Sequence, residues 1–183
     1  MTAPRGTVAI VGIGGVFPGA RDFEEFWANI VNGRSAAREA PPGRWALDAA
    51  EAYDERPGQP DKVYSTRGCF VTQDPKLDER LKLPVDDPNE LDASTRLLLA
   101  AGAQAYADAK MSSLDAECVG VILGNLALPT ESAAAIADRT IGRTLEEKVL
   151  GAGAVTIGRD VHPLNKFVTG MPAGILATAL GLG

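Results

Sequence analysis

A cluster of glycines near the N-terminus is the first feature that could do chemistry, because it follows an apolar run. Gly12, Gly14 and Gly15 come directly after VAIV, where a dinucleotide-binding turn would place its phosphate-cradling glycines. That turn needs a third glycine at position 17, but the chain has Phe17, whose ring prevents close packing of helix and strand. About twenty residues further on, where an acidic residue would bind the ribose, the chain has Asn32. No Gly-Lys-Ser or Gly-Lys-Thr follows, so the glycines indicate a tight exit from a strand rather than a nucleotide site.

Nucleophilic and metal-ligating side chains are few. Cys69 and Cys118 belong to no CxxC pair, and His162 is the single histidine, so no zinc site is expected. A cysteine nucleophile needs an activating base within hydrogen-bond reach, and the spacing of these residues supplies none. We expect Cys69 to be a buried structural thiol, Cys118 to pack in the apolar run that it opens, and His162 to lie in a loop or on the surface.

The composition is that of an ordinary soluble domain, with 183 residues, 45% hydrophobic and 23% charged. The net charge is −6 and no block of Lys or Arg is present, which argues against a nucleic-acid partner. The apolar run 8–17 is too short to cross a membrane, so we expect no membrane span and a cytoplasmic location.

The elements that must position these residues alternate between strand and helix. The pattern predicts buried strands over 7–15 and 118–126, and a turn-rich, irregular insert over about 37–90. Helices are predicted over 21–33, capped by Asp22 and ended by Gly33, and from 92 onward, capped by Asp92 or Ser94. Further helices are predicted over 129–150, interrupted near Gly142, and over 168–183. The order indicates a layered α/β fold with a mainly parallel sheet, yet two strands are too few to cover so much apolar helix.

Taken together, these segments resemble the N-terminal part of β-ketoacyl synthases, the condensing enzymes of fatty-acid and polyketide assembly. The stretches that carry the resemblance are VAIVGIG, FPGA, FEEFWANIVNGRSA, PPGRWALD, GCFV, LDASTRLLLAAGAQAYADA, VGVILGN and TGMPAGILATALGLG. Family members usually begin the helix LDASTRLLLAAGAQAYADA with acid-Pro-Gln-x-Arg; this chain keeps Asp92 and Arg96 but has Ala93 in place of the proline. VILGNLALPTE is most similar to condensing domains of polyunsaturated-fatty-acid and related iterative polyketide synthases.

The resemblance implies a thiolase-like αβαβα fold, of which residues 1–183 would be only the N-terminal half. In such enzymes the acyl group on a cysteine is attacked by the carbanion formed when a carrier-bound malonyl unit loses carbon dioxide. The resemblance places that cysteine and the assisting histidines downstream of Gly183, so no catalytic residue is expected in this chain, which should be inactive alone. No bound cofactor or metal is implied, because the substrates are carried on the phosphopantetheine of an acyl carrier protein.

The resemblance also implies partners and a pocket. The expected partners are the remaining half of the ketosynthase domain, the acyl carrier protein, and a second subunit in a homodimer or heterodimer, with 129–150 as candidate dimer helices. The turn after the second predicted strand would line the acyl pocket near the dimer axis, together with part of the last helix. The candidate lining residues are Asn125, Leu126, Ala127, Met171 and Ile175. Relatives often carry an arginine near position 175.

Two other hypotheses remain beside a ketosynthase segment. One is a non-catalytic subunit, of the chain-length-factor or docking type, that uses the fold to shape another protein's pocket. The other is the nucleotide-binding α/β enzyme, against which Phe17 argues.

Overall fold

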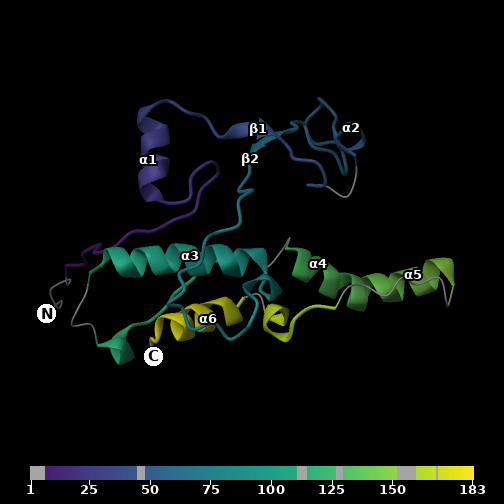
Figure 1. The fold of residues 1–183 in the computed structure, drawn as a ribbon. Helices are drawn as coiled ribbons and strands as arrows, with labels where there is room; N and C mark the ends of the chain where they lie inside the picture. Colours follow the sequence, from purple (N-terminus) through teal and green to yellow (C-terminus); the bar gives the residue numbers. More distant parts are fainter. Residues whose placement is uncertain (1–6, 45–47, 111–114, 127–129, 152–159, 168) are drawn as a thin grey trace, which may run out of the picture. The chain divides into compact units, whose positions relative to one another are not determined.

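The computed structural model describes residues 7–44, 48–110, 115–126, 130–151, 160–167 and 169–183. The chain forms two compact units, labelled element by element in Figure 1. One unit is Gly15–Gln73, and the other combines Met1–Gly14 with Asp74–Gly183.

The unit Gly15–Gln73 contains two helices and a two-stranded antiparallel sheet. These elements are α1 (Phe23–Val31), β1 (Ala37–Glu39), α2 (Ala49–Ala52) and β2 (Arg67–Cys69). The prediction for α1 is confirmed: the Asp22 carboxylate accepts the Glu25 N–H at 2.8 Å, and Gly33 follows the helix with φ +63°. No residue of α1 is fully buried: Phe23 and Phe26 of its apolar stripe are partly buried, whereas Trp27, Ile30 and Val31 are exposed.

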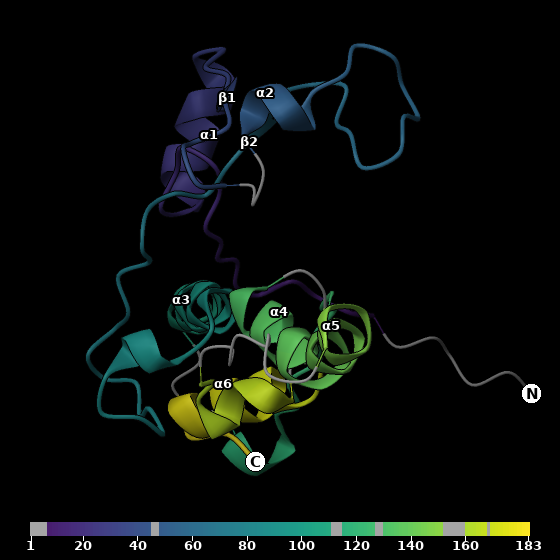
Figure 2. The same ribbon diagram turned by 90° about the vertical axis from the view of Figure 1, so that its right-hand side faces the viewer.

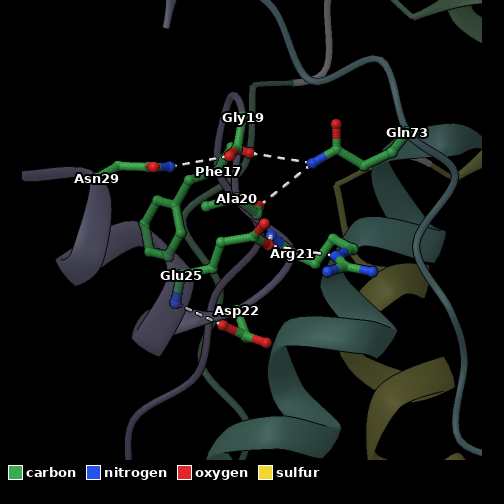
Figure 3. A network of polar contacts seen from close by, with 8 residues as sticks. All are labelled: Phe17, Gly19, Ala20, Arg21, Asp22, Glu25, Asn29 and Gln73. Carbon is green, nitrogen blue, oxygen red and sulfur yellow. Dashed lines mark hydrogen bonds and ion pairs between the residues drawn. The ribbon is translucent and has the colours of Figure 1, made fainter. Parts of the chain in front are cut away.

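Polar contacts hold the two ends of this unit together (Figure 3). The Gln73 amide nitrogen donates to the carbonyl oxygens of Phe17 and Ala20, both at 3.3 Å, and the Asn29 amide donates to the carbonyl of Gly19 at 2.9 Å. The ring of Phe17 stacks on that of Phe26 with a centroid distance of 4.1 Å. The large ring at position 17 is therefore part of the hydrophobic contact that fixes the turn to α1.

The second unit is mainly helical. It contains η1 (Pro88–Glu90), α3 (Ala93–Asp108), η2 (Ala116–Cys118), α4 (Glu131–Ala137), the π-helical turn η3 (Asp138–Gly142), α5 (Arg143–Leu150), η4 (Pro163–Lys166) and α6 (Met171–Leu180). The helices predicted from the sequence are confirmed here, including the interruption near Gly142, which is the π-helical turn between α4 and α5.

The core of this unit lies between α3 and α6, which run side by side in both views (Figures 1 and 2). It is built from Leu91, Leu99, Ile175, Leu176 and Ala179, with leucines of the segment 77–83 packed against it. The helices approach closely because α3 has a glycine at the crossing: a Cβ on Gly102 would lie 2.7 Å from Leu176 Cδ1. Burial of these side chains is the main apolar contribution to the stability of this unit.

The glycine-rich segment packs on α3 so closely that side chains do not fit between the two backbones. A Cβ on Gly12 would lie 2.8 Å from the nitrogen of Ala109, and one on Gly14 would lie 2.5 Å from the nitrogen of Ala105. Between them, the Ile13 N–H donates to the Asp108 carboxylate at 3.0 Å. These glycines therefore serve a close approach of two backbones, which explains them without a nucleotide.

The prediction of strands over 7–15 and 118–126 is wrong: the structure has no strand in either segment. Neither segment forms strand pairs, and Val8 and Ile122, predicted to be buried, are 93% and 97% exposed. A strand exists only where a neighbour accepts and donates its backbone hydrogen bonds, and these segments have no such neighbour among the described residues. The described sheet instead lies within the predicted irregular insert, which also contains α2 and η1.

Replacing Gly14 by alanine is expected to lower the free energy of unfolding by about 1–3 kcal/mol, because the added methyl group would meet the α3 backbone rather than a movable side chain. Gly120→Ala is the matched control, since nothing lies within 4 Å of the added carbon. It should change stability by less than about 0.5 kcal/mol. Urea denaturation followed by circular dichroism measures both, and equal stability of the two variants would contradict the packing.

Candidate functional site

A buried carboxylate lies where two helices of the larger unit begin. Asp92 is the N-cap of α3 and is 7% exposed; its Oδ1 accepts the backbone N–H of Ser94 at 3.0 Å and the Ser94 hydroxyl at 2.7 Å. The side chains of Thr130 and Ser132, at the start of α4, act with Ser94 to lower the pKa of this carboxylate. The prediction that Asp92 or Ser94 caps this helix is thus resolved in favour of Asp92.

The opposite side of this junction is held by Asn165, in η4. Its Oδ1 accepts the backbone N–H of Asp92 at 2.9 Å, and its Nδ2 donates to the carbonyl of Glu90 at 2.7 Å. Asn165 is 6% exposed, so both polar atoms of its side chain are satisfied away from bulk water. Two segments far apart in sequence, 90–94 and 162–165, therefore meet at one polar cluster.

The surroundings of Asp92 favour the ionised carboxylate. Burial acts to raise the pKa of Asp92, but the hydrogen bonds from Ser94, Ser132 and Thr130 outweigh it, and the pKa lies below the ordinary value of 3.8. The start of a helix also favours an anion, because the first N–H groups and the helix dipole point at it. Asp92 is therefore a largely buried carboxylate that its surroundings keep ionised.

The predicted pocket residues fall into two groups. Ile175 is 3% exposed within the α3–α6 core, and Met171, one turn earlier on α6, packs against the same core. Leu126 is 84% exposed and Asn125 is also exposed, so neither is part of that core. Ala127 lies outside the described residues. Met171 and Ile175 thus contact the same core, whereas Asn125 and Leu126 lie outside it.

Two hollows of about 440 and 560 Å³ lie along α3, and neither is lined by any of these residues. Both lie between α3 and the segment 76–81, where Asp78, Arg80, Ala103 and Ala107 line each of them. The Arg80 guanidinium donates hydrogen bonds to the Asp78 carboxylate, with Nε 2.9 Å from Oδ1, and these bonds lower the pKa of Asp78 to about 2.

The cysteines and the histidine do not form a catalytic pair. Cys69 and Cys118 are both exposed, so the prediction of buried, packed thiols is wrong; the Cys118 Sγ donates to Asp115 Oδ2 at 3.3 Å. His162 lies in a turn, as predicted, where its Nδ1 accepts the Leu164 N–H at 3.3 Å. Among the described residues no group of three or more His, Cys, Asp or Glu could hold a metal ion. No helix in the described part of the chain is long and apolar enough to span a membrane.

Sequence reasoning missed Thr130, Ser132 and Asn165. A threonine directly before an alanine-rich helix is a recognisable cap, and Thr130 Oγ1 indeed accepts the Ala133 N–H at 3.1 Å. No local pattern marks Asn165, because its partner Asp92 is 73 residues away.

A family model for the β-ketoacyl synthase N-terminal domain matches residues 5–183. The chain therefore belongs to the β-ketoacyl synthase family, and the resemblance found in the sequence is confirmed.

The relatives are polyketide synthases. The chain is 34% identical over 125 residues to polyketide synthase ThaG of Burkholderia thailandensis, and 32% identical over 124 residues to polyketide synthase PksL of Bacillus subtilis. The first match covers 67% of this chain and 2% of that protein, and the second covers 66% and 3%. The chain thus spans a small part of the relatives that it matches.

Two solved structures share the fold. The PfaC keto synthase–chain length factor matches with a TM-score of 0.67 and 26% identity, over 96% of this chain and 20% of that one. The oxazolomycin ketosynthase domain OzmH KS7 of Streptomyces albus JA3453 matches with a TM-score of 0.52 and 21% identity, over 94% of this chain and 27% of that one. The predicted thiolase-like fold class, represented by its N-terminal half, is confirmed by these neighbours.

The contribution of Asp92 to stability is expected to depend on pH. Because its pKa is lowered in the folded state, the stabilisation is present above the unfolded-state pKa and is lost as the pH falls through the folded-state value. Asp92→Asn should therefore lose about 1–3 kcal/mol at pH 7, and the difference from wild type should shrink below about pH 4.

Urea unfolding of both proteins at pH 7, 5 and 3 measures this difference. Other acidic groups, such as Asp78, are present in both proteins and cancel. The exposed Asp86 supplies the control variant Asp86→Asn, which should stay within about 0.5 kcal/mol of wild type throughout. A constant gap between wild type and Asp92→Asn from pH 7 to pH 3 would contradict the charge of Asp92.

Proposed function

We propose that this chain is the N-terminal segment of a β-ketoacyl-ACP synthase that performs decarboxylative Claisen condensation in polyketide or fatty-acid biosynthesis. In this reaction a carrier-bound malonyl unit loses carbon dioxide, and the resulting carbanion attacks an acyl thioester on cysteine. A carbon–carbon bond forms and the bond from the acyl carbon to the cysteine sulfur breaks. The substrates would be held on the phosphopantetheine of an acyl carrier protein.

The observation that carries the proposal is the match of nearly the whole chain to the N-terminal domain of the family, together with apolar segments that have no strand partner in the described part of the chain. Val8, Ile10 and Ile122 are each more than nine-tenths exposed, although they stand in runs with the composition of core strands. A segment with exposed apolar side chains and an unpaired backbone favours pairing with further strands. We assign those strands to the cysteine-bearing part of the domain.

The chemistry of the described residues supports a segment that is inactive alone. The two cysteines are exposed, and His162, the only histidine, is engaged with Leu164 and lies 4.0 Å from Glu90. A thiol nucleophile requires a base in contact with it, but the Cys118 thiol donates to Asp115 and the His162 ring accepts from Leu164. The nucleophile and its histidines would therefore come from beyond Gly183, as the family resemblance implies.

The acyl pocket would be lined by Asn125, Leu126 and Ala127 from one side and by Met171 and Ile175 from the other. A dimer would use the helices of 129–150. The exposed apolar residues Ile141, Leu145 and Val149 follow one another at four-residue spacing there and give an open stripe that suits a helix partner.

A second candidate is a non-catalytic subunit of the chain-length-factor type. It is favoured by the similarity to a protein described as a keto synthase–chain length factor. The two candidates differ at one residue, the nucleophile, which a ketosynthase has and a chain-length factor replaces.

The chain alone is expected to form no condensation product from acyl and malonyl carrier thioesters, because it supplies no activated nucleophile. Joined to the cysteine-bearing part of its ketosynthase domain, it should form a 3-ketoacyl thioester, and replacing the nucleophilic cysteine by alanine should abolish the product. Mass spectrometry of the carrier-bound products measures all three. Condensation by the chain alone would overturn the assignment, and a joined protein that binds the carrier without condensing would favour the chain-length-factor candidate.

Ile122→Asp tests the strand pairing. The side chain is exposed in this chain, so its replacement should leave the stability of the chain within about 0.5 kcal/mol of wild type. In the joined domain the same charge would be buried without a partner and should prevent assembly. Tyr64→Asp is the control, an exposed aromatic residue in the loop between α2 and β2, and it should assemble normally. Co-purification of the two parts distinguishes these outcomes, and normal assembly of Ile122→Asp would contradict the pairing.

A further inference from the structure

One arginine of α3 bonds to both ends of the irregular segment 74–91. The Arg96 guanidinium donates through Nη1 to the carbonyl of Leu91 at 3.2 Å and through Nη2 to the carboxylate of Asp74 at 3.0 Å. The segment between these two acceptors is therefore closed into a loop, which we call the strap. We propose that Arg96 is a positioning residue that closes the strap and thereby holds α6 in place. The identity of α6 as a wall of the acyl pocket rests on the proposed function, but the closure of the strap does not.

The strap contacts α6 through a backbone hydrogen bond and through apolar side chains. The Lys82 N–H donates to the carbonyl of Ala179 at 3.1 Å, and this bond joins the middle of the strap to the last turn of α6. The apolar side chains of the strap that pack against the α3–α6 core are Leu77, Leu81, Leu83 and Val85. That core contains Ile175 and Leu176 of α6, so the strap supports the helix that carries two of the proposed pocket residues.

Apolar packing alone fixes the strap incompletely. The four apolar side chains of the strap that reach the core are only partly buried. The hollows of about 440 and 560 Å³ lie between α3 and residues 76–81, so this part of the strap is not packed tightly on the helix. Loosely packed apolar contacts allow several arrangements of similar energy, whereas hydrogen bonds to a charged group have a direction. The position of the strap therefore depends on the bonds at its two ends.

An arginine suits this junction because its planar guanidinium can donate to two acceptors in fixed directions. The side chain of Arg96 is 16% exposed, whereas that of Asp74 is 78% exposed. The Nε atom of Arg96 is buried and has no hydrogen-bond partner among the described residues, and an unpaired buried donor costs free energy. This cost offsets part of what the two bonds contribute to overall stability. Loss of the guanidinium should therefore affect the strap more than it affects the fold as a whole.

Arg96→Met tests the closure in the 183-residue chain. Methionine is unbranched and has a similar helix propensity, but it removes both bonds together with the unpartnered Nε. Residue-resolved hydrogen exchange should accelerate at least about tenfold at the Lys82 amide, whose bond to Ala179 requires a closed strap. The slowest-exchanging amides of α3 should change less than about threefold, because the α3–α6 core stays intact. Unchanged exchange at Lys82 would overturn the proposal.

Asp74 supplies variants that should fold normally, because its side chain is largely exposed. Asp74→Ala should accelerate exchange at Lys82 at least about threefold, whereas Asp74→Asn keeps an acceptor oxygen and should stay within about twofold of wild type. The matched control is Asp86→Ala, which removes another exposed aspartate of the strap and should also stay within about twofold. The double variant of Arg96→Met and Asp74→Ala should exchange no faster at Lys82 than Arg96→Met alone, because both changes remove the same bond. Effects that multiply, or equal effects of Asp74→Ala and Asp86→Ala, would contradict the closure by Arg96.

The link from the strap to the pocket is measured after this chain is joined to the cysteine-bearing part of its ketosynthase domain. Arg96→Met and Asp74→Ala should change the ratio of kcat/KM for long and short acyl substrates at least about threefold, with Asp86→Ala unchanged. Faster exchange at Lys82 with an unchanged ratio would refute the link to the pocket. Unchanged exchange with condensation intact would refute the positioning role and leave the proposed function standing. Faster exchange in the variants, without any condensation by the joined wild-type protein, would leave the strap standing and refute the proposed function.

Discussion

A buried carboxylate needs hydrogen-bond donors from the protein in place of water, and this requirement constrains the unit that contains residues 74–183. Asp92 is nearly fully buried, and an ionised carboxylate without partners in that position would cost several kcal/mol. Its near neighbour in sequence, Ser94, donates to it from the backbone and from the hydroxyl, while Asn165, 73 residues away, accepts the N–H of the Asp92 backbone. The apolar core between α3 and α6 supplies most of the favourable free energy, but leucine contacts alone tolerate sliding. The polar cluster removes that freedom.

The features that the sequence predicted well are those encoded within a few residues. Asp22 for α1, and Asp92 or Ser94 for α3, were predicted as caps because a short polar side chain before an apolar helical pattern accepts hydrogen bonds from the first free N–H groups of a helix. Gly33 was predicted to end α1 because glycine adopts the left-handed backbone conformation without steric cost, whatever its neighbours are. Asn165 was not predictable in this way, since its role exists only once residues 90–92 have been brought beside it. The family resemblance reached further because it compares whole arrangements of such local signals.

The same distinction explains the glycine-rich segment and the strands. Glycine after an apolar run allows another group to approach the backbone very closely. The sequence alone does not distinguish a bound phosphate from the backbone of a helix as that group. Here the neighbour of Gly12 and Gly14 is the backbone of α3. Strand composition is equally indirect. Val8 and Ile122 stand in runs rich in β-branched residues, but a strand forms only when a neighbouring segment pairs with its backbone hydrogen bonds. Residues 37–39 and 67–69 form a sheet because each segment pairs with the other.

These properties fit together in the proposed ketosynthase segment. A condensing site must hold an acyl chain of defined length beside a nucleophile, which demands walls fixed to within a fraction of an ångström. The runs around Val8 and Ile122, which have no strand partner among the described residues, would accept the layer that brings the nucleophile. The α3–α6 core, which contains Ile175, would hold one wall of the acyl pocket in place from within this chain. The pocket and the nucleophile would thus be contributed by different parts of one domain.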